Sequence, residues 1–281
     1  MNYVLAISGG IDSMVLLDMF NHSHRGEFVV AHFDHGMRPS SKTDAEFVRK
    51  KAKEYGAKFY LGEGHLSASA SEAEARAARY SFLRDVAKKE GGAIITAHHM
   101  NDLVETIAIN ILRGTGWRGL APFSDQEVIR PFIHSGRPVA KYDIYMAASL
   151  ANLTYRQDPT NSEDKYLRNR LRKPIFDTFF ADDYYKILEL HLKQLGLREE
   201  IENLAASLIP EDGIYQRSWF VDLDNEVAAE ILRAGLARKK ISLTRPQMQQ
   251  FLQAIREYAP GKKFNLPGDN LVTIRKNVFV I

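Results

Sequence analysis

The first hundred residues alternate between short apolar runs and longer segments with helical spacing. The apolar runs, which are typical of strands buried on both faces, are Tyr3–Ile7, Phe28–Phe33, Phe59–Leu61 and Ala93–Ala97. The segments with helical character that follow them are Met14–Phe20, Thr43–Tyr55, Ser71–Lys89 and Asp102–Leu112. This repeated strand–helix order predicts an α/β fold with a parallel sheet and helices on both faces.

The pattern changes beyond residue 120. Tyr142–Leu153 and Tyr184–Leu208 have helical spacing, and the second is long enough to be a connector. From Ser218 the chain reads as a strand, two helices and a closing hairpin, with turn residues at Leu266–Asn270 and a last strand at Val278–Ile281. We therefore expect a Rossmann-like domain at 1–183, a helical connector at 184–214 and a small α+β domain at 215–281.

Composition narrows the class of protein. The 281 residues are 45% hydrophobic and 26% charged, with a net charge of only +3, which is ordinary globular composition. No apolar run approaches the roughly 20 residues that a membrane helix needs, and the N-terminus does not resemble a secretory signal. The absence of cysteine excludes disulfides, thiolate metal sites, iron–sulfur clusters and persulfide chemistry. We expect a cytoplasmic protein without a membrane partner.

Three polar stretches follow predicted strands. They are Ser8–Ser13, His32–Arg38 and His98–Glu105. Because ligands of parallel α/β sheets bind at the carboxyl ends of the strands, the three stretches should meet at one edge and form a site.

The stretch Ser8-Gly9-Gly10-Ile11-Asp12-Ser13 joins the first strand to a helix. Two glycines let the backbone approach a ligand closely, and a helix N-terminus attracts phosphate. The pattern is neither a Walker A loop nor Gly-x-Gly-x-x-Gly. Without a Walker lysine, main-chain amides and hydroxyls must hold most of a pyrophosphate, with Mg²⁺ sharing its charge. The alternative is a tight turn in which Asp or Ser caps the helix.

A second constellation is His98-His99-Met100-Asn101-Asp102-Leu103-Val104-Glu105. In a helix that begins near Asn101, Asp102 and Glu105 lie three apart on one face. Paired carboxylates beside a phosphate site suit an ammonium substrate that must lose a proton before it attacks. A zinc site is possible from the residue types, although the spacing is unusual. A plain helix cap explains part of the pattern.

Cationic residues gather in several places. Arg168, Arg170, Arg172 and Lys173 form one cluster and Arg238, Lys239 and Lys240 another, and both suit an RNA backbone or a solvated helix face. Arg76 and Arg79 lie one helical turn apart, which alone is typical of a solvated face. Arg113-Gly114, in a glycine-rich segment, is a candidate phosphate- or RNA-facing loop or a connector. His32 is a candidate for the base pocket of a nucleotide.

The Ser8–Ser13 loop resembles the pyrophosphate loop of the PP-loop ATP pyrophosphatases (the HUP type of fold). That resemblance implies attack on the α-phosphorus of ATP, formation of an adenylate and release of pyrophosphate. Together, the blocks from this loop to Arg172 and from Val227 to Ile281 resemble the tRNA(Ile)-lysidine synthetase family. The family implies ATP, Mg²⁺, free L-lysine and a tRNA(Ile) with a CAU anticodon, whose wobble cytidine (position 34) becomes lysidine and reads AUA.

The resemblance also implies roles for individual residues. Ser8, Gly9, Gly10, Ile11 and Ser13 would bind ATP with His32, Arg113 and Gly114. Asp12 would lie beside ATP and the reaction centre, where it is also the candidate protein ligand of an Mg²⁺ held by the phosphates. The remaining catalytic roles fall to Arg79 for phosphate charge, His98 near the α-phosphate, Asp102 and Glu105 for lysine, and Arg172 for the tRNA or the adenylate.

Two departures from the family pattern limit these expectations. Many relatives have Asp where this chain has Asn101, so no role is expected there. Some relatives carry a further C-terminal domain that contacts the acceptor arm, so we expect a different or weaker contact here. The alternatives are another PP-loop ligase that forms an amide, a tRNA thiolase, which the missing cysteines disfavour, and a tRNA-binding module with a regulatory ATP site. A homodimer is expected only from the family.

Overall fold

A computed structural model of the protein describes residues 2–36, 41–64, 72–156 and 167–281. The chain divides into two compact units, Met1–His191 and Leu192–Ile281. The division falls inside a long helix, α8 (Ala181–Ser207). The domain limits expected from the sequence remain a prediction.

The first unit contains a five-stranded sheet in the order β3-β2-β1-β4-β5, with every neighbouring pair parallel. The strands are β1 (Asn2–Ala6), β2 (Phe28–Asp34), β3 (Lys58–Glu63), β4 (Gly92–Ile95) and β5 (Val128–Ile129). The helices are α1 (Ile11–Ser23), α2 (Ser41–Glu54), α3 (Glu72–Glu90), α4 (Met100–Leu112), the 3₁₀ turn η1 (Trp117–Leu120), α5 (Pro131–His134), α6 (Lys141–Leu150) and α7 (Leu167–Thr178). The predicted parallel α/β fold is confirmed.

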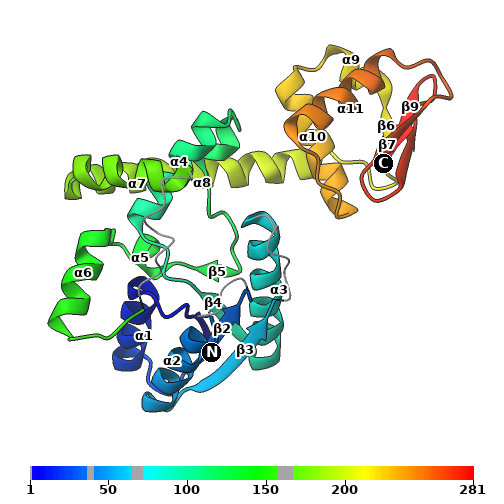
Figure 1. The fold of residues 1–281 in the computed structure, drawn as a ribbon. Helices are drawn as coiled ribbons and strands as arrows, with labels where there is room; N and C mark the ends of the chain where they lie inside the picture. Colours follow the sequence, from blue (N-terminus) through cyan, green and yellow to red (C-terminus); the bar gives the residue numbers. More distant parts are fainter. Residues whose placement is uncertain (1, 37–40, 65–71, 157–166) are drawn as a thin grey trace. The chain divides into compact units, whose positions relative to one another are not determined.

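Helices cover both faces of this sheet (Figure 1). Leu5 and Val30 pack with α1 and α2, whereas the adjacent Val4 and Val29 pack with α3. This alternation follows from the two-residue period of a strand, and it explains why β1 and β2 are apolar on both faces.

A separate apolar cluster joins α4, α7 and α8. It consists of Met100, Leu103, Val104, Ile133, Ile175, Tyr184 and Leu188. Ile175 lies in α7 directly after Pro174. Proline is normally disfavoured in the interior of a helix. The cluster fixes α7 against α4, and this contact brings the arginine-rich segment to the end of the sheet.

The second unit has its own core. It contains β6 (Ile214–Gln216), α9 (Arg217–Asp222), α10 (Asn225–Arg238), α11 (Arg245–Glu257), β7 (Lys263–Leu266), β8 (Asn270–Thr273) and β9 (Val278–Val280). β6 pairs with β9 and β7 with β8, both antiparallel. The ring of Tyr215 stacks on Phe279 at a centroid distance of 5.2 Å. This small α+β fold agrees with the class predicted for the C-terminal region.

Among the described residues, no helix is both long and apolar enough to cross a membrane. 

The closest packing in the second unit gives a stability prediction. A methyl group on Gly235, inside α10, would overlap the hydroxyl of Tyr215, which is fully buried. Gly235→Ala should therefore lower the free energy of unfolding by about 1–3 kcal/mol, as overpacking usually does, although alanine is the better helix former. Urea denaturation monitored by circular dichroism measures this change.

Gly196 in α8 is the matched control, because nothing lies within 4 Å of an added methyl group there. Gly196→Ala should raise stability by about 0.5–1 kcal/mol from helix propensity alone. Equal responses of the two variants would contradict the steric argument.

Candidate functional site

The Ser8–Ser13 loop closes around one hydroxyl group. Ser13 Oγ accepts hydrogen bonds from the backbone N–H groups of Ser8 (3.2 Å) and Gly9 (3.1 Å), and it donates one to the carbonyl of Gly10 (2.8 Å). Gly9 has φ +90°, a left-handed conformation that favours glycine. α1 begins directly afterwards, so the unpaired N–H groups of its first turn open beside the loop. Ser13 therefore shapes the loop from inside.

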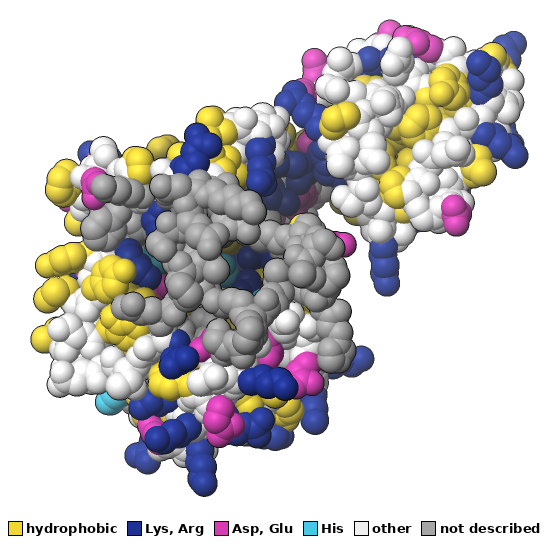
Figure 2. All heavy atoms as spheres, viewed as in Figure 1, with side chains coloured by type: hydrophobic (Ala, Val, Ile, Leu, Met, Phe, Trp, Pro, Cys, Tyr) yellow, Lys and Arg dark blue, Asp and Glu magenta, His cyan; other side chains and the backbone are white. Residues whose placement is uncertain are grey.

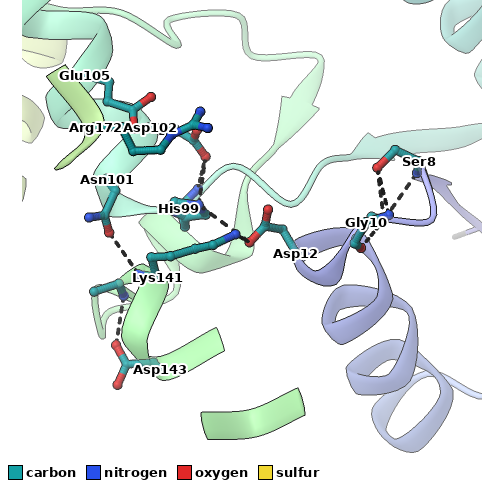
Figure 3. A network of polar contacts seen from close by, with 12 residues as sticks. Ser8, Gly10, Asp12, His99, Asn101, Asp102, Glu105, Lys141, Asp143 and Arg172 are labelled. Carbon is teal, nitrogen blue, oxygen red and sulfur yellow. Dashed lines mark hydrogen bonds and ion pairs between the residues drawn. The ribbon is translucent and has the colours of Figure 1, made fainter. Parts of the chain in front are cut away.

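Asp12 lies at the mouth of this loop and meets groups from two other elements (Figure 3). Its Oδ1 is 2.5 Å from Nζ of Lys141, the first residue of α6, and 3.6 Å from Nε2 of His99. His99 Nε2 is in turn 3.4 Å from Oδ2 of Asp102. Asp12, His99 and Asp102 thus form a carboxylate–imidazole–carboxylate chain, with the ammonium of Lys141 at one end.

Asp102 also holds the start of α4. Its Oδ2 accepts a hydrogen bond from the backbone N–H of His99 at 3.0 Å. This is the reciprocal half of a capping box. Asp102 thus takes part in capping the helix, as one interpretation of this motif held. The same carboxylate also faces the His99 ring, so capping is not its only contact.

Asn101 connects three helices. Its Nδ2 donates to the hydroxyl of Tyr184 in α8 at 2.7 Å, and its Oδ1 accepts from the backbone N–H of Lys141 at 2.8 Å. The side chain is buried. No role was expected at this position, and the contacts make it the residue that anchors α6 against α4.

Glu105 and Arg172 form a partly buried ion pair. Glu105 is only 1% exposed, and its Oε1 is 3.1 Å from Nε of Arg172 in α7. Burial disfavours the charged form of Arg172, but Glu105, Asp102 and Asp12 outweigh it, so its pKa is raised. The structure therefore brings Arg172 to the carboxylates, with Glu105 as its direct partner.

His98 lies on the other side of the site. Its Nδ1 is 2.8 Å from the hydroxyl of Thr96, and its ring lies 5.1 Å from that of Phe123. Burial lowers the pKa of His98 to about 3, against the smaller opposing effect of Asp102. The imidazole is neutral at physiological pH.

Arg76, Arg79 and Arg130 act with burial to lower the pKa of His98. Arg76 and Arg79 lie on α3, with their guanidinium groups 4.7 and 5.5 Å from the ring of Tyr80. Arg130 is 2% exposed and donates from Nη1 to three backbone carbonyls, at 2.9 to 3.4 Å. The charges of three arginines therefore act on His98, and the phosphate role expected for Arg79 remains a prediction.

The other predicted nucleotide-binding residues are His32, Arg113 and Gly114. His32 is buried at the end of β2 and its Nδ1 contacts the carbonyl of Ile7 at 2.8 Å, so it braces the strand before the loop. Arg113 and Gly114 are exposed beyond the last residue of α4. At 1.5 Å per residue, they lie roughly 20 Å from the helix start. The structure does not bring them together with Asp12.

The predicted RNA-contacting cations lie in both units. Arg170 is exposed on α7, and Arg238, Lys239 and Lys240 are exposed at the end of α10. The side chains of Arg168 and Lys173 are outside the described part of the structure, as are Arg38 and residues 158–161.

Sequence reasoning missed Lys141, His99, Asn101 and Arg130. Lys141 and Asp12 are 129 positions apart, and no motif marks the lysine. His99 stands beside His98, and the pattern alone does not say which imidazole reaches Asp12. For Arg130 the available signal was a charged residue directly after the short apolar run that forms β5.

The site suits an Mg²⁺ ion that is held jointly by one protein carboxylate and the phosphates of a nucleotide. Among the described residues, no three His, Cys, Asp or Glu side chains are grouped to hold a metal. Asp12 Oδ2 makes no ion pair with any described residue, since both of the pairs of this carboxylate use Oδ1. One carboxylate oxygen combined with phosphate oxygens and water is the donor set that Mg²⁺ prefers.

Comparisons with known proteins identify the family of the chain. A family model described as "PP-loop domain" matches residues 1–179. A protein of Enterococcus faecalis named "tRNA(Ile)-lysidine synthase" is 35% identical over 61% of this chain and 39% of its own length. One of Caldanaerobacter subterraneus subsp. tengcongensis with the same name is 37% identical over 74% of this chain and 44% of its own length. The chain thus spans about two fifths of the length of these relatives.

A solved structure shares the fold. The U34-tRNA thiolase of Methanococcus maripaludis, described with its [4Fe-4S] cluster, aligns with a TM-score of 0.58 at 16% identity, over 70% of this chain and 73% of that one.

The loop geometry separates two glycine variants. Gly10 has φ −71°, and an added methyl group would meet only Ser8 Oγ, at 3.5 Å. Gly10→Ala should keep the free energy of unfolding within about 0.5 kcal/mol of wild type and weaken nucleotide binding by crowding the phosphates. Gly9→Ala should cost about 1–2 kcal/mol, because its backbone is left-handed. Thermal unfolding and ATP titration measure the two effects. Unchanged ATP binding by Gly10→Ala would contradict the phosphate role of the loop.

The buried imidazole gives a pH prediction. His98 binds a proton near pH 3 when folded and near its ordinary 6.5 when unfolded, so the unfolded chain holds more protons between these values. Its contribution to stability should be complete above about pH 6.5 and fall as the pH drops toward 3. Urea unfolding at pH 7, 6, 5 and 4.5 should show a shallower loss for His98→Gln than for wild type. Identical slopes would mean that His98 keeps its proton affinity on folding.

Proposed function

This chain belongs to the PP-loop domain family, and from that premise we propose that it is a tRNA(Ile)-lysidine synthetase. It would use ATP to join lysine to C2 of cytidine 34 in a tRNA(Ile) with a CAU anticodon. The products would be lysidine, AMP and pyrophosphate. The names of the curated relatives support the substrate, and the geometry supports the chemistry.

The observation that carries the proposal is the meeting of Asp12, His99, Asp102 and Arg172 at the mouth of the Ser8–Ser13 loop. A phosphate-binding loop alone would suit many nucleotide enzymes. Carboxylates directly beside it provide a place for an amine, which a reaction between an adenylate and lysine requires.

In the first step, O2 of cytidine 34 attacks the α-phosphorus of ATP. A bond forms between that oxygen and phosphorus, and the bond from phosphorus to the bridging oxygen breaks with its electron pair leaving on pyrophosphate. The amides of the loop and the first turn of α1 would hold the departing group. Arg79 and Arg76 would offset the charge that grows on the phosphoryl oxygens. Neutral His98 would contribute a hydrogen bond.

In the second step, the ε-amine of lysine attacks C2, and the C2–O bond to the phosphoryl group breaks to release AMP. Asp102 is the stronger candidate to bind the ammonium, because it lies at the mouth, with its side chain 20% exposed, whereas Glu105 is already paired with Arg172. Loss of an ammonium proton must precede attack, and His99 between two carboxylates is placed to receive it.

Asp12 would bind Mg²⁺ together with the phosphates of ATP, since one of its oxygens is available for a hard cation. The ion would supply charge neutralisation for the polyphosphate.

The RNA would contact cations from both units, with Arg170 on α7 and the Arg238–Lys240 cluster as candidates. Lys and Arg side chains are visible on both units on the face that Figure 2 shows. Selection of tRNA(Ile) would then depend on contacts spread along the RNA. A homodimer and a cytoplasmic location also remain proposals.

The thiolase neighbour does not favour sulfur transfer. This chain has no cysteine to hold a cluster or carry a persulfide, and a likeness at 16% identity extends only to the fold.

The direct test incubates the protein with ATP, labelled lysine and unmodified tRNA(Ile) with a CAU anticodon. Label should enter the tRNA with equimolar AMP, and a tRNA with uridine at position 34 should stay unlabelled. ATP turnover without transfer of label would contradict lysidine synthesis, and tight tRNA binding without turnover would favour a binding module.

Asp102→Asn refines the test. The amide oxygen can still accept the hydrogen bond from His99 N–H, so α4 keeps its cap, but the negative charge is lost. We expect ATP binding within about twofold of wild type and a fall in lysine transfer of 10²-fold or more, the scale typical of a catalytic base. An unchanged dependence of the rate on lysine concentration would show that Asp102 does not bind the amine.

A further inference from the structure

Lys141 has a position that helix stability does not explain. It is the first residue of α6, where the helix dipole disfavours a cation. Asp143 caps this end of the helix, since its Oδ2 accepts a hydrogen bond from the backbone N–H of Ala140 at 2.8 Å. The ammonium of Lys141 instead turns toward the phosphate-binding loop and meets Asp12 (Figure 3).

The backbone of Lys141 is fixed, whereas its side chain has room to move. The buried amide of Asn101 holds its N–H at 2.8 Å. The ammonium is bound to Asp12 at 2.5 Å and lies 5.3 Å from the ring of Tyr145, and the side chain remains 21% exposed. A lysine side chain is a flexible four-carbon stem that ends in a compact charge. The ammonium can therefore exchange partners while α6 stays in place.

The charges around Asp12 favour such an exchange. Three carboxylates lie here, and Lys141 is bound to Asp12 and Arg172 to Glu105. A bound polyphosphate adds negative charge directly beside Asp12. Mg²⁺ on Asp12 Oδ2 and the phosphates then competes with the Lys141 ammonium, which is on Oδ1, for the negative charge of one carboxylate.

We propose that Lys141 is a catalytic residue of the adenylation step, which exchanges Asp12 for the phosphates when Mg²⁺ and ATP bind. Its ammonium moves from Asp12 Oδ1 to the oxygens around the α-phosphorus and the leaving pyrophosphate. It stays protonated and transfers no proton. Its charge stabilises the electron pair that departs with pyrophosphate when the cytidine oxygen attacks. Lys141 thus supplies the cation that this loop lacks in comparison with a Walker motif.

This inference rests on the proposed function for the identity of the attacking oxygen. The exchange of partners at Asp12 rests only on the geometry of the site. The two parts are therefore separable by experiment.

The first measurement needs neither RNA nor lysine. Binding of a non-hydrolysable ATP analogue is titrated as a function of Mg²⁺ in wild type, Lys141→Met and Lys53→Met, a control at an exposed position of α2. If Lys141 competes with Mg²⁺ for Asp12, Lys141→Met should reach half-saturation at a several-fold lower Mg²⁺ concentration, and the control should match wild type. An unchanged or higher Mg²⁺ requirement would overturn the exchange.

The second measurement is single-turnover release of pyrophosphate with saturating ATP and unmodified tRNA. Lys141→Met should reduce the rate constant by about 10²–10³-fold, as loss of one transition-state cation does, with a much smaller change in ATP affinity. Lys141→Arg should restore part of the rate. A loss seen only in ATP affinity, or one explained by a lower unfolding temperature, would leave Lys141 as a structural partner of Asp12.

A double-mutant cycle with Asp12→Asn distinguishes a lasting ion pair from an exchange. If the pair persists in the reacting complex, the double variant should be no slower than the worse single variant. If the two residues act on different partners, the two losses should multiply. Wild-type protein that releases no pyrophosphate with this tRNA would refute the proposed function, while the Mg²⁺ titration would still decide the exchange.

Discussion

The site depends on one constraint, the parallel pairing of β1 with β4 at the centre of the sheet. The chain turns to opposite sides after these two strands, because the next strand after β1 is β2 on one side and the next strand after β4 is β5 on the other. Leu5 is in register with Ile95, so both strands end at the same level. The segments that follow, Ser8–Ser13 and His98–Asp102, must therefore face each other. A crevice that can hold a ligand forms at such a reversal of strand order, and it brings a carboxylate to a phosphate loop.

The sheet could be predicted because its signals are local. Apolar runs of strand length and the glycine-rich loop are readable within a few residues, and repeated crossovers then determine a parallel order. β5 has only the two residues Val128–Ile129, too few to produce a pattern. α7 was not predicted as a helix because Pro174 lies inside it, and the apolar cluster with α4 and α8 supplies the stability that local propensity lacks.

The residues of the site were predictable only where they belong to those local motifs. Asp12 and Asp102 follow strands, so topology alone places them at the same edge. Lys141 reaches Asp12 from an element 129 positions away, and its direction depends on how Asn101 anchors α6. The choice of His99 over His98 as the link between the carboxylates depends on where α4 begins. One residue of difference in that start exchanges the directions of the two rings.

Compensation of charge connects these observations. Glu105 is almost fully buried and Arg172 offsets its charge, since an unpaired buried carboxylate would be strongly destabilising. Glu105 is consequently a poor first contact for an incoming ammonium, unless Arg172 moves to another anion. Asp102 faces the His99 ring, and its half of the capping box fixes its position. Asp102 and Glu105, which have the same expected role in the sequence, thus differ in their surroundings. Glu105 holds the arginine that α7 brings to the site, whereas Asp102 faces His99 and caps α4.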